Sequence, residues 1–317
     1  MFDDLETEKN NPKTSKLDEM NVYEILRTIN QEDATVALTI TENLENVVKI
    51  VDNCISVIKN GGRVIYVGAG TSGRVAVVDA VETVPTFGVE PGVFLPLIAG
   101  GERAFFQATE NVEDSEEMGK SDLENVGVNN KDYIIGVTAS GRTPYVKGAL
   151  IKAKDIGCKT SLVCNVKNPE LKDLADVTVT LRTGPEVITG STRMKAGTSQ
   201  KMVLNMISTV TMIKLGKTYK NYMVDVKVMN RKLEDRAIRI ISEITGLDRG
   251  KSREYLLKAE MRPKLAILMI LSGEDKQRCE KVLRETEVIN EALKKLKEWI
   301  NNGKSSYSIV LQIIFRP

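Results

Sequence analysis

Glycines, hydroxyls and two carboxyls lie close together in the stretch 61–88, GGRVIYVGAGTSGRVAVVDAVETVPTFG. Its apolar start predicts a buried strand, and Gly68-Ala-Gly-Thr-Ser-Gly73 predicts a turn before a helix that continues to Pro85. Thr71 and Ser72 would let hydroxyls and backbone N–H groups face one small anion. Because the positive end of the helix dipole lies at the same place, the loop is predicted to bind a phosphate group.

Glu82 is the second carboxyl of this stretch and lies near the C-terminal end of the predicted helix. The helix is apolar almost all round, so we expect it to be buried and Glu82 to retain its proton more easily than usual. Asp79 lies one turn earlier and could strengthen this effect by like-charge coupling, or could pair with a surface arginine. A protonated carboxyl beside a phosphate site is a candidate general acid.

Two further loops combine small, hydroxyl and cationic residues before predicted helices, at 138–144 and 190–197. Hydroxyls, a guanidinium and helix N-terminal amides together could hold a phosphate. Simple helix capping and surface charge would also explain both loops. The candidate ligands in these loops are Ser140, Arg142, Thr143, Ser191 and Lys195.

The acidic run 110–117, ENVEDSEE, is a second source of carboxylates. Such runs are most often solvated helix faces, and this interpretation suits Glu116 and Glu117. Glu113 differs because it closely follows the second predicted strand, on the side where a ligand should bind. Spacing alone favours a surface role for Glu113 over a catalytic one.

Gly68–Gly73 also matches the G-x-G-x-x-G fingerprint of dinucleotide-binding folds. That interpretation requires an acid at the end of the second strand to bind the ribose hydroxyl. The second strand ends in Pro96-Leu-Ile-Ala-Gly-Gly101, and the first acid is Glu102. The hydroxyl-bearing loop therefore suits a single phosphate or a sugar better than a pyrophosphate.

Composition excludes several classes of function. The 317 residues include 45 basic and 43 acidic ones, which predicts neither a nucleic-acid nor a membrane partner. No histidine is present, which removes His-based acid–base chemistry and His-ligated metal sites. Four cysteines lack CxxC spacing, no apolar run approaches 18 residues, and the N-terminus is not signal-like. We expect a soluble, cytoplasmic protein without a metal or cofactor.

Short apolar segments alternate with helical patterns between residues 63 and 215. This alternation predicts a parallel sheet with helices on both faces, in which ligands bind at the carboxyl ends of the strands. The predicted strands are 63–67, 92–98, 133–137, 160–165 and 177–181. The predicted helices between and after them are 73–83, 102–118, 143–156 and 196–215.

Outside this region the pattern changes. Residues 1–17 are polar without a period and are predicted to be disordered, and helices are predicted at 16–30 and 33–59. After about residue 225 the pattern is all-helical, with an apolar stripe over 233–244 and a stop at Thr245-Gly246. The predicted division is an α/β domain at 18–225, a helical subdomain at 226–300 and a tail at 301–317, to whose segment 305–317 we assign no function.

Taken together, these segments resemble one family, the N-acetylmuramic acid 6-phosphate etherases of the sugar isomerase (SIS) superfamily. The matching segments are EILRTINQEDATVAL (24–38), IYVGAGTSGR (65–74), DAVETVPTFGV (79–89), LIAGGERA (97–104), ENVEDS (110–115), ASGRTPYV (139–146), GPEVITGSTRMKAGTSQKMVLNM (184–206) and NYMVDV (221–226). GSTRMKAGT with TFGV is highly specific, whereas a generic SIS domain would share only the two Gly/Ser/Thr loops. The resemblance spans roughly residues 17–283 and implies a flavodoxin-like fold with a five-stranded parallel sheet.

The resemblance also implies an activity and its residues. It makes the chain a carbon–oxygen lyase that converts N-acetylmuramic acid 6-phosphate to N-acetylglucosamine 6-phosphate and D-lactate, in recycling or catabolism of cell-wall sugars. It assigns the general acid to Glu82 and the second catalytic glutamate to Glu113. It implies no cofactor, and a homodimer whose site is completed at the interface.

Two departures from the family pattern lie beside the glutamates. The family's S-E-C-P-P is Val81-Glu82-Thr83-Val84-Pro85 here, and the glycine and alanine of E-G-A-E-D are Asn111 and Val112. Because both glutamates are retained, we interpret these departures as drift in packing. A changed substrate and weaker activity are the alternatives. The rival functions are another SIS sugar-phosphate isomerase and a non-catalytic sugar-phosphate regulator, such as the glucokinase regulatory proteins.

Overall fold

The computed structural model describes residues 5–109, 111–228 and 230–299, which form two compact units. The first unit contains the described residues up to Thr83 together with Glu90–Thr211. The second contains Val84–Val89 and the described residues from Met212 onward. The predicted tail at 301–317 lies outside the described residues.

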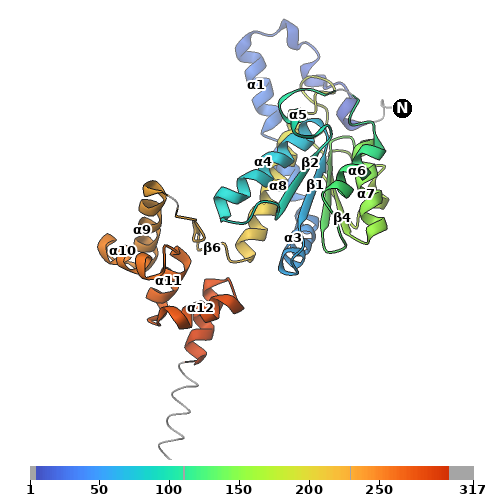
Figure 1. The fold of residues 1–317 in the computed structure, drawn as a ribbon. Helices are drawn as coiled ribbons and strands as arrows, with labels where there is room; N and C mark the ends of the chain where they lie inside the picture. The colour runs from blue at the N-terminus through green and yellow to red at the C-terminus, as the bar shows by residue number, and fades with distance from the viewer. Residues whose placement is uncertain (1–4, 110, 229, 300–317) are drawn as a thin grey trace, which may run out of the picture. The chain divides into compact units, whose positions relative to one another are not determined.

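A five-stranded parallel sheet forms the centre of the first unit, which confirms the predicted fold class (Figure 1). The strands lie in the order β2-β1-β3-β4-β5. Their bounds are β1 Val64–Gly68, β2 Phe94–Ile98, β3 Tyr133–Thr138, β4 Lys159–Cys164 and β5 Val177–Thr180. The chain leaves β1 toward β2 and returns to β3 on the other side of β1, so the strand order reverses there. In open α/β sheets such a reversal opens a crevice for ligands at the carboxyl ends of the strands.

Helices cover both faces of this sheet (Figure 1). On one face, Ile65, Val67, Ile134 and Leu162 of the strands pack with Tyr145 and its neighbours in a buried apolar cluster. On the other face, the Tyr66 hydroxyl of β1 donates a hydrogen bond to Asp79 in the helix that follows β1. The helices of the unit that flank or follow strands are α3 Leu44–Lys59, α4 Gly70–Phe87, α5 Gly101–Phe106, α6 Glu116–Asn125, α7 Pro144–Ile156 and α8 Lys195–Lys214.

The edge strand β2 carries a proline in its middle, Pro96, which lies opposite Tyr66 of β1. The Ala99 N–H donates to the Gly68 carbonyl at 3.0 Å, and the Val93 carbonyl accepts from the Val64 N–H at 2.9 Å. Odd-numbered residues of β2 therefore direct their polar backbone groups toward β1. Since peptide groups alternate along a strand, the nitrogen of Pro96 lies on the outer edge.

Four helical predictions differ from the structure. In place of the predicted helix 16–30, a 3₁₀ turn at Leu17–Glu19 precedes an α-helix that begins at Val22. The predicted helix 33–59 is interrupted, because α1 Val22–Asp33, α2 Val36–Thr41 and α3 are separate. The predicted helix 102–118 is divided into α5 and α6, with a turn at Asn111, whose φ is 65°. Helix α4 begins at Gly70 rather than 73 and continues through Pro85 to Phe87. Gly73 permits this early start because any side chain there would collide with the Gly68 carbonyl oxygen.

Residues 5–17, which were predicted to be disordered, are ordered in the structure. They form the short 3₁₀ turns η2 Glu6–Glu8 and η3 Pro12–Thr14, and η4 Leu17–Glu19 follows directly. Thr7, Asn11 and Thr14 are buried. Polar composition here reflects a segment that supplies buried hydrogen bonds rather than one without structure.

The second unit contains the predicted helical bundle. Its helices are α9 Arg231–Thr245, α10 Arg249–Lys258, α11 Pro263–Ser272 and α12 Lys276–Glu285, and residues 289–299 are also helical. Gly246 ends α9 in the left-handed conformation, as the stop signal predicts. A two-stranded hairpin, β6 Thr218–Tyr219 and β7 Tyr222–Met223, was not predicted. Across the described chain, no helix is both apolar enough and long enough to span a membrane.

Candidate functional site

The carboxyl ends of the strands bring the predicted loops together. A side chain at Gly197, in the first turn of α8, would come within 2.9 Å of the Thr71 Cγ2 atom. Glycine there allows α8 to start directly against the loop after β1. Thr71 is half-buried and Ser72 is buried, and Ser191 precedes α8 in the same region of the chain. The hydroxyl-bearing loop and the start of α8 are therefore neighbours.

The loop between β3 and α7 is compact and rich in hydroxyls. The Thr138 Oγ1 atom lies 2.6 Å from Thr143 Oγ1 and 3.3 Å from Ser140 Oγ. Thr143 stands at the N-cap of α7, but its hydroxyl makes no capping hydrogen bond to the helix. The interpretation of Thr143 as a simple cap is therefore wrong. Arg142 forms an ion pair with Glu170 at 3.3 Å.

Glu113 lies beside this same loop. Its backbone carbonyl accepts a hydrogen bond from the Tyr145 N–H, in the first turn of α7, at 2.9 Å. The contact depends on the close approach of α6 to α7, where a side chain at Gly119 would overlap the Tyr145 carbonyl and one at Gly148 the Glu116 carbonyl. The side chain of Glu113 is exposed. Its backbone is thus fixed at the start of α7 while its carboxylate is free of the core.

Glu82 is not where the sequence predicts. It is exposed, and so are Val78 and Val81 on the same helix, so the expectation that α4 is buried all round is wrong. Glu82 follows Gly70 by twelve residues in one continuous helix, which places it about 18 Å along the axis from the loop after β1. Within its own chain, Glu82 lies far from the loop that precedes its helix.

Asp79 is the buried acid of α4. It accepts hydrogen bonds from the Tyr66 hydroxyl at 3.0 Å, from Asn205 Nδ2 at 2.6 Å and from the Ser208 hydroxyl at 2.9 Å. Burial raises the pKa of Asp79, and the hydrogen bonds from Asn205, Ser208 and Tyr66 oppose the rise. Asp79 is buried whereas Glu82, three residues later, is exposed, and the partners recorded for Asp79 among the described residues are these three donors and not a surface arginine. Its role is to join α4 to β1 and α8.

Replacing Asp79 by alanine is expected to lower the free energy of unfolding by about 2 kcal/mol or more, because three donors lose their buried acceptor. Asparagine at this position keeps an oxygen for Asn205 and Ser208, and the Tyr66 hydroxyl can rotate to accept. Urea unfolding of the two variants measures the difference. Equal stability of the alanine variant and the wild type would contradict the assigned role.

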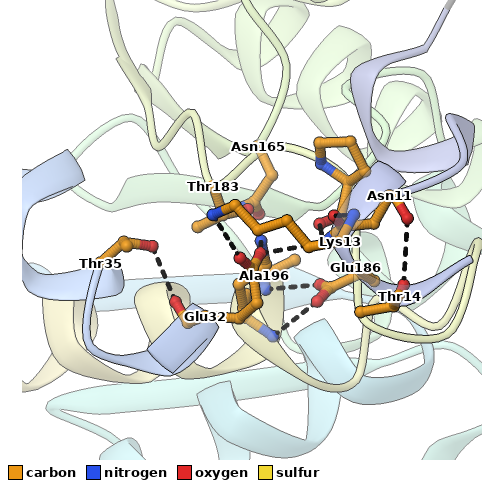
Figure 2. A network of polar contacts seen from close by, with 11 residues as sticks. Asn11, Lys13, Thr14, Glu32, Thr35, Asn165, Thr183, Glu186 and Ala196 are labelled. Carbon is orange, nitrogen blue, oxygen red and sulfur yellow. Dashed lines mark hydrogen bonds and ion pairs between the residues drawn. The ribbon is translucent and has the colours of Figure 1, made fainter. Parts of the chain in front are cut away.

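Lys195 is drawn into a buried ion pair. Its Nζ atom lies 2.7 Å from Glu32 Oε2, and the side chains are 3% and 7% exposed. Glu32 also accepts from Asn11 Nδ2 at 2.9 Å and from Lys13 Nζ at 2.8 Å, as Figure 2 shows. Burial alone would raise the pKa of Glu32, but hydrogen bonds from Lys13, Lys195 and Asn11 outweigh it and lower the pKa to about 2.

Glu186 occupies the N-terminus of α8. Its carboxylate accepts from the backbone N–H of Lys195 at 3.0 Å and of Ala196 at 2.9 Å, and it is fully buried (Figure 2). Burial raises its pKa, and these two amides act in the opposite direction. The carboxylate of Glu186 therefore occupies the N-terminus of α8, where the sequence predicts that a phosphate could bind.

Sequence reasoning missed Glu186, Glu32 and Asn11, which donates to Glu32. Glu32 and Lys195 are 163 positions apart, so no local spacing links them. The sequence does contain one signal for Glu186, because this acid lies nine residues before the start of α8, whose N-terminus it caps. Of the predicted ligands, the structure brings Thr71, Ser140 and Thr143 to the carboxyl edge of the sheet.

Models of known protein families agree with this fold. Family models match at residues 46–154 (glucokinase regulatory protein N-terminal SIS domain), 101–210 (SIS domain) and 220–293 (C-terminal lid domain of glucokinase regulatory protein). A solved phosphoheptose isomerase from Francisella tularensis aligns with a TM-score of 0.48 and 15% identity, over 61% of this chain and 98% of that one.

Curated relatives match over almost the full length. An N-acetylmuramic acid 6-phosphate etherase from Petrotoga mobilis is 74% identical over 297 residues, which cover 94% of this chain and 100% of the relative. One from Pseudothermotoga lettingae is 55% identical over 289 residues, covering 91% and 97%. A third, from Bacillus cereus, is 49% identical over 299 residues, covering 94% and 97%.

Proposed function

The chain belongs to the N-acetylmuramic acid 6-phosphate etherase family, and on that premise we propose that it cleaves the D-lactyl ether of N-acetylmuramic acid 6-phosphate. The products are N-acetylglucosamine 6-phosphate and D-lactate, which places this carbon–oxygen lyase in the recycling or catabolism of cell-wall amino sugars. The 74% identity over the whole of a named etherase is the observation that carries the proposal.

The reaction requires one base and one acid. In the open-chain sugar, the C2 proton is acidic because the C1 aldehyde stabilises the resulting carbanion. A base removes this proton, an acid protonates the ether oxygen, and the C3–O bond breaks to release D-lactate. Water then adds at C3 of the unsaturated aldehyde. Carboxyl groups can supply both proton transfers, so a chain without histidine can catalyse the sequence.

We assign Glu113 as the base and Glu82 as the acid. Support for Glu113 comes from its hydrogen-bonded position at the start of α7, next to the loop with Ser140 and Thr143. That loop, with Arg142 and the hydroxyls of Thr71, Ser72 and Ser191, is proposed to bind the 6-phosphate and the sugar hydroxyls. Lys195 is proposed to stabilise this site through its ion pair with Glu32 and not to contact the substrate.

Glu82 is proposed to act in the site of a second copy of the chain. It is exposed and about 18 Å along α4 from the loop of its own chain, so it cannot complete that loop's site without a partner. The exposed Val78 and Val81 beside it are suited to a contact between copies. We therefore propose a homodimer in the cytoplasm with sites shared across its interface.

The experiment that tests the activity is D-lactate release from N-acetylmuramic acid 6-phosphate by the purified protein. Release coupled to N-acetylglucosamine 6-phosphate supports the etherase. Interconversion of ketose and aldose phosphates without lactate would indicate the isomerase, and binding without turnover would indicate a regulator.

The shared site is tested by mixing two inactive variants. Dimers formed by co-expressing Glu82→Gln and Glu113→Gln chains should regain about a quarter of the wild-type activity. About half of randomly paired dimers are mixed, and each mixed dimer holds one site with both glutamates. Each variant alone serves as the control. Absence of any recovery, with mixed dimers isolated by two different tags, would mean that both glutamates act within one chain.

A further inference from the structure

The connection between β5 and α8, residues 181–194, contains neither helix nor strand, yet it carries Ser191 of the proposed substrate site. We call this connection the Ser191 loop. In compact domains, connections longer than about 12–15 residues without secondary structure are uncommon and are usually functional. Because no ladder of backbone hydrogen bonds holds such a segment, its conformation must be fixed by side chains and by the segments that pack against it.

One support lies within the Ser191 loop itself. The Glu186 carboxylate accepts from the backbone N–H of Lys195 at 3.0 Å and of Ala196 at 2.9 Å, which ties the loop to the first turn of α8. The middle of the loop is not held by this contact. Ile188 is exposed there, and Gly190 has a φ of 74°. The middle of the Ser191 loop therefore depends on another segment of the chain.

Residues 5–14, which we call the strap, contact the Ser191 loop at separate points along its length. Glu6 Oε1 lies 3.3 Å from Arg182 Nη2, near the start of the loop. Glu8 lies against Gly190, where an added side chain would come within 2.8 Å of the Glu8 Oε2 atom. The strap therefore follows the loop from its beginning to the residue before Ser191.

Asn11 is the buried junction between the strap and both ends of the Ser191 loop. Its Nδ2 group donates to the Pro185 carbonyl at 3.4 Å and to Glu32 Oε2 at 2.9 Å (Figure 2). Glu32 in turn binds Lys195 Nζ at 2.7 Å. The side-chain amide has two N–H donors, and each has its own acceptor here. One side chain thus connects residue 185 directly, and residue 195 through Glu32, to the strap.

We propose that Asn11 is a positioning residue for the substrate, through which the strap holds the Ser191 loop in the conformation that receives the sugar phosphate. The inference rests on the proposed function in taking Ser191 as a ligand of that substrate. Asn11 is 4% exposed, so it acts through the loop and does not touch the reacting atoms. A loop that must be ordered when its ligand binds lowers the affinity, because ordering costs conformational entropy.

Asn11→Leu tests the proposal, and Asn10→Leu is its matched control because Asn10 is the exposed neighbour in the strap. Leucine is of similar size but donates no hydrogen bond. Calorimetry on the full chain should show the dissociation constant of N-acetylglucosamine 6-phosphate raised about tenfold by Asn11→Leu, since both donors are lost. Asn10→Leu should stay within about twofold of the wild type. In D-lactate release, KM of Asn11→Leu should rise by a similar factor while kcat stays within about twofold.

Hydrogen exchange distinguishes positioning from a role in stability alone. In Asn11→Leu, the backbone amides of residues 184–194 should exchange about tenfold faster, while those of β3 exchange as in the wild type. A role in stability alone would lower the urea midpoint and leave both the dissociation constant and the exchange of the Ser191 loop unchanged. That result would overturn the proposal.

The outcomes separate the strap from the enzyme activity. If the wild type releases no D-lactate but binds N-acetylglucosamine 6-phosphate, and Asn11→Leu weakens this binding, the positioning role stands and the proposed function fails. If the wild type releases D-lactate and Asn11→Leu binds and reacts as Asn10→Leu does, the function stands and the positioning role is overturned. A wild type that binds no sugar phosphate overturns both.

Glu8→Ala decides the question if Asn11→Leu fails to fold. The Glu8 side chain is exposed, so its removal should leave the chain folded. Loss of its contact at Gly190 should raise the dissociation constant of N-acetylglucosamine 6-phosphate about threefold. An unchanged dissociation constant in this variant would overturn the positioning role of the strap.

Discussion

Replacement of Glu113 by glutamine is expected to lower D-lactate release from N-acetylmuramic acid 6-phosphate by about 100- to 10,000-fold. Glutamine keeps the size and shape of the side chain but cannot accept the C2 proton, and a positioned base contributes a factor of this order. The loss should appear in kcat, because the exposed carboxylate of Glu113 holds no part of the fold together. Steady-state kinetics with a lactate dehydrogenase readout measures it.

Glu117→Gln is the matched control for this variant. Glu117 is an exposed acid four residues further along, and its recorded ion pair is with the half-exposed Lys120 at 3.6 Å. Such surface pairs contribute little, so activity should stay within about twofold of the wild type. Exchange of the C2 proton with deuterium from solvent gives a second readout, because it reports the base separately from departure of the lactate. A Glu113→Gln enzyme that still exchanges this proton at the wild-type rate would remove Glu113 from the role.

Replacement of Lys195 by methionine is expected to lower the free energy of unfolding by about 3–5 kcal/mol. The substitution removes the 3%-exposed ammonium and leaves the Glu32 carboxylate buried beside methionine, and an uncompensated buried charge has a cost of this size. Urea denaturation followed by circular dichroism provides the measurement. The remaining bonds from Asn11 and Lys13 keep the expected loss at the lower end of the range.

Lys13→Met is the matched control, because Lys13 binds the same carboxylate at 2.8 Å but is itself exposed. Its loss should cost less than about 1 kcal/mol. The double variant Glu32→Gln with Lys195→Met should recover part of the stability, since neither charge remains buried. Equal losses for the Lys13 and Lys195 variants would show that burial of the pair does not determine its contribution.

The sheet could be predicted from the sequence because β1, β2 and β3 are short apolar runs, each followed by a loop of small and polar residues. Strands β3 and β4 lie within about one residue of their predicted bounds, since a buried parallel strand has no polar alternation to confuse the pattern. The hydroxyl loops at 68–73 and 138–144 were recognisable for the same reason: small and hydroxyl residues interrupt apolar runs at the points where strands end.

The position of Glu82 could not be read in the same way. An apolar surrounding in sequence predicts burial, but Val78 and Val81 are exposed in the single chain. Periodicity records that a surface is apolar and does not record whether the same chain or another one covers it. The buried acid of that helix is Asp79, whose partners Asn205 and Ser208 lie more than 120 positions away.

The prediction of disorder for residues 5–17 is wrong for a related reason. Residues 5–17 are polar because Asn11 and Lys13 satisfy the carboxylate of Glu32, which itself satisfies Lys195. A polar composition predicts disorder, whereas these polar side chains form hydrogen bonds with distant parts of the chain. Long-range polar pairing of this kind leaves no mark within a window of a few residues.

Pro96 in the edge strand β2 has a consequence for how copies of this chain can meet. Its nitrogen lies on the outer side of β2 and carries no hydrogen, so the row of donors along that edge is broken at its centre. A strand from another molecule could not continue the hydrogen-bond ladder past this point. Open sheet edges are a common route to uncontrolled stacking of chains, and this one is blunted. Association is thereby directed to helical surfaces, where side chains rather than the backbone select the partner.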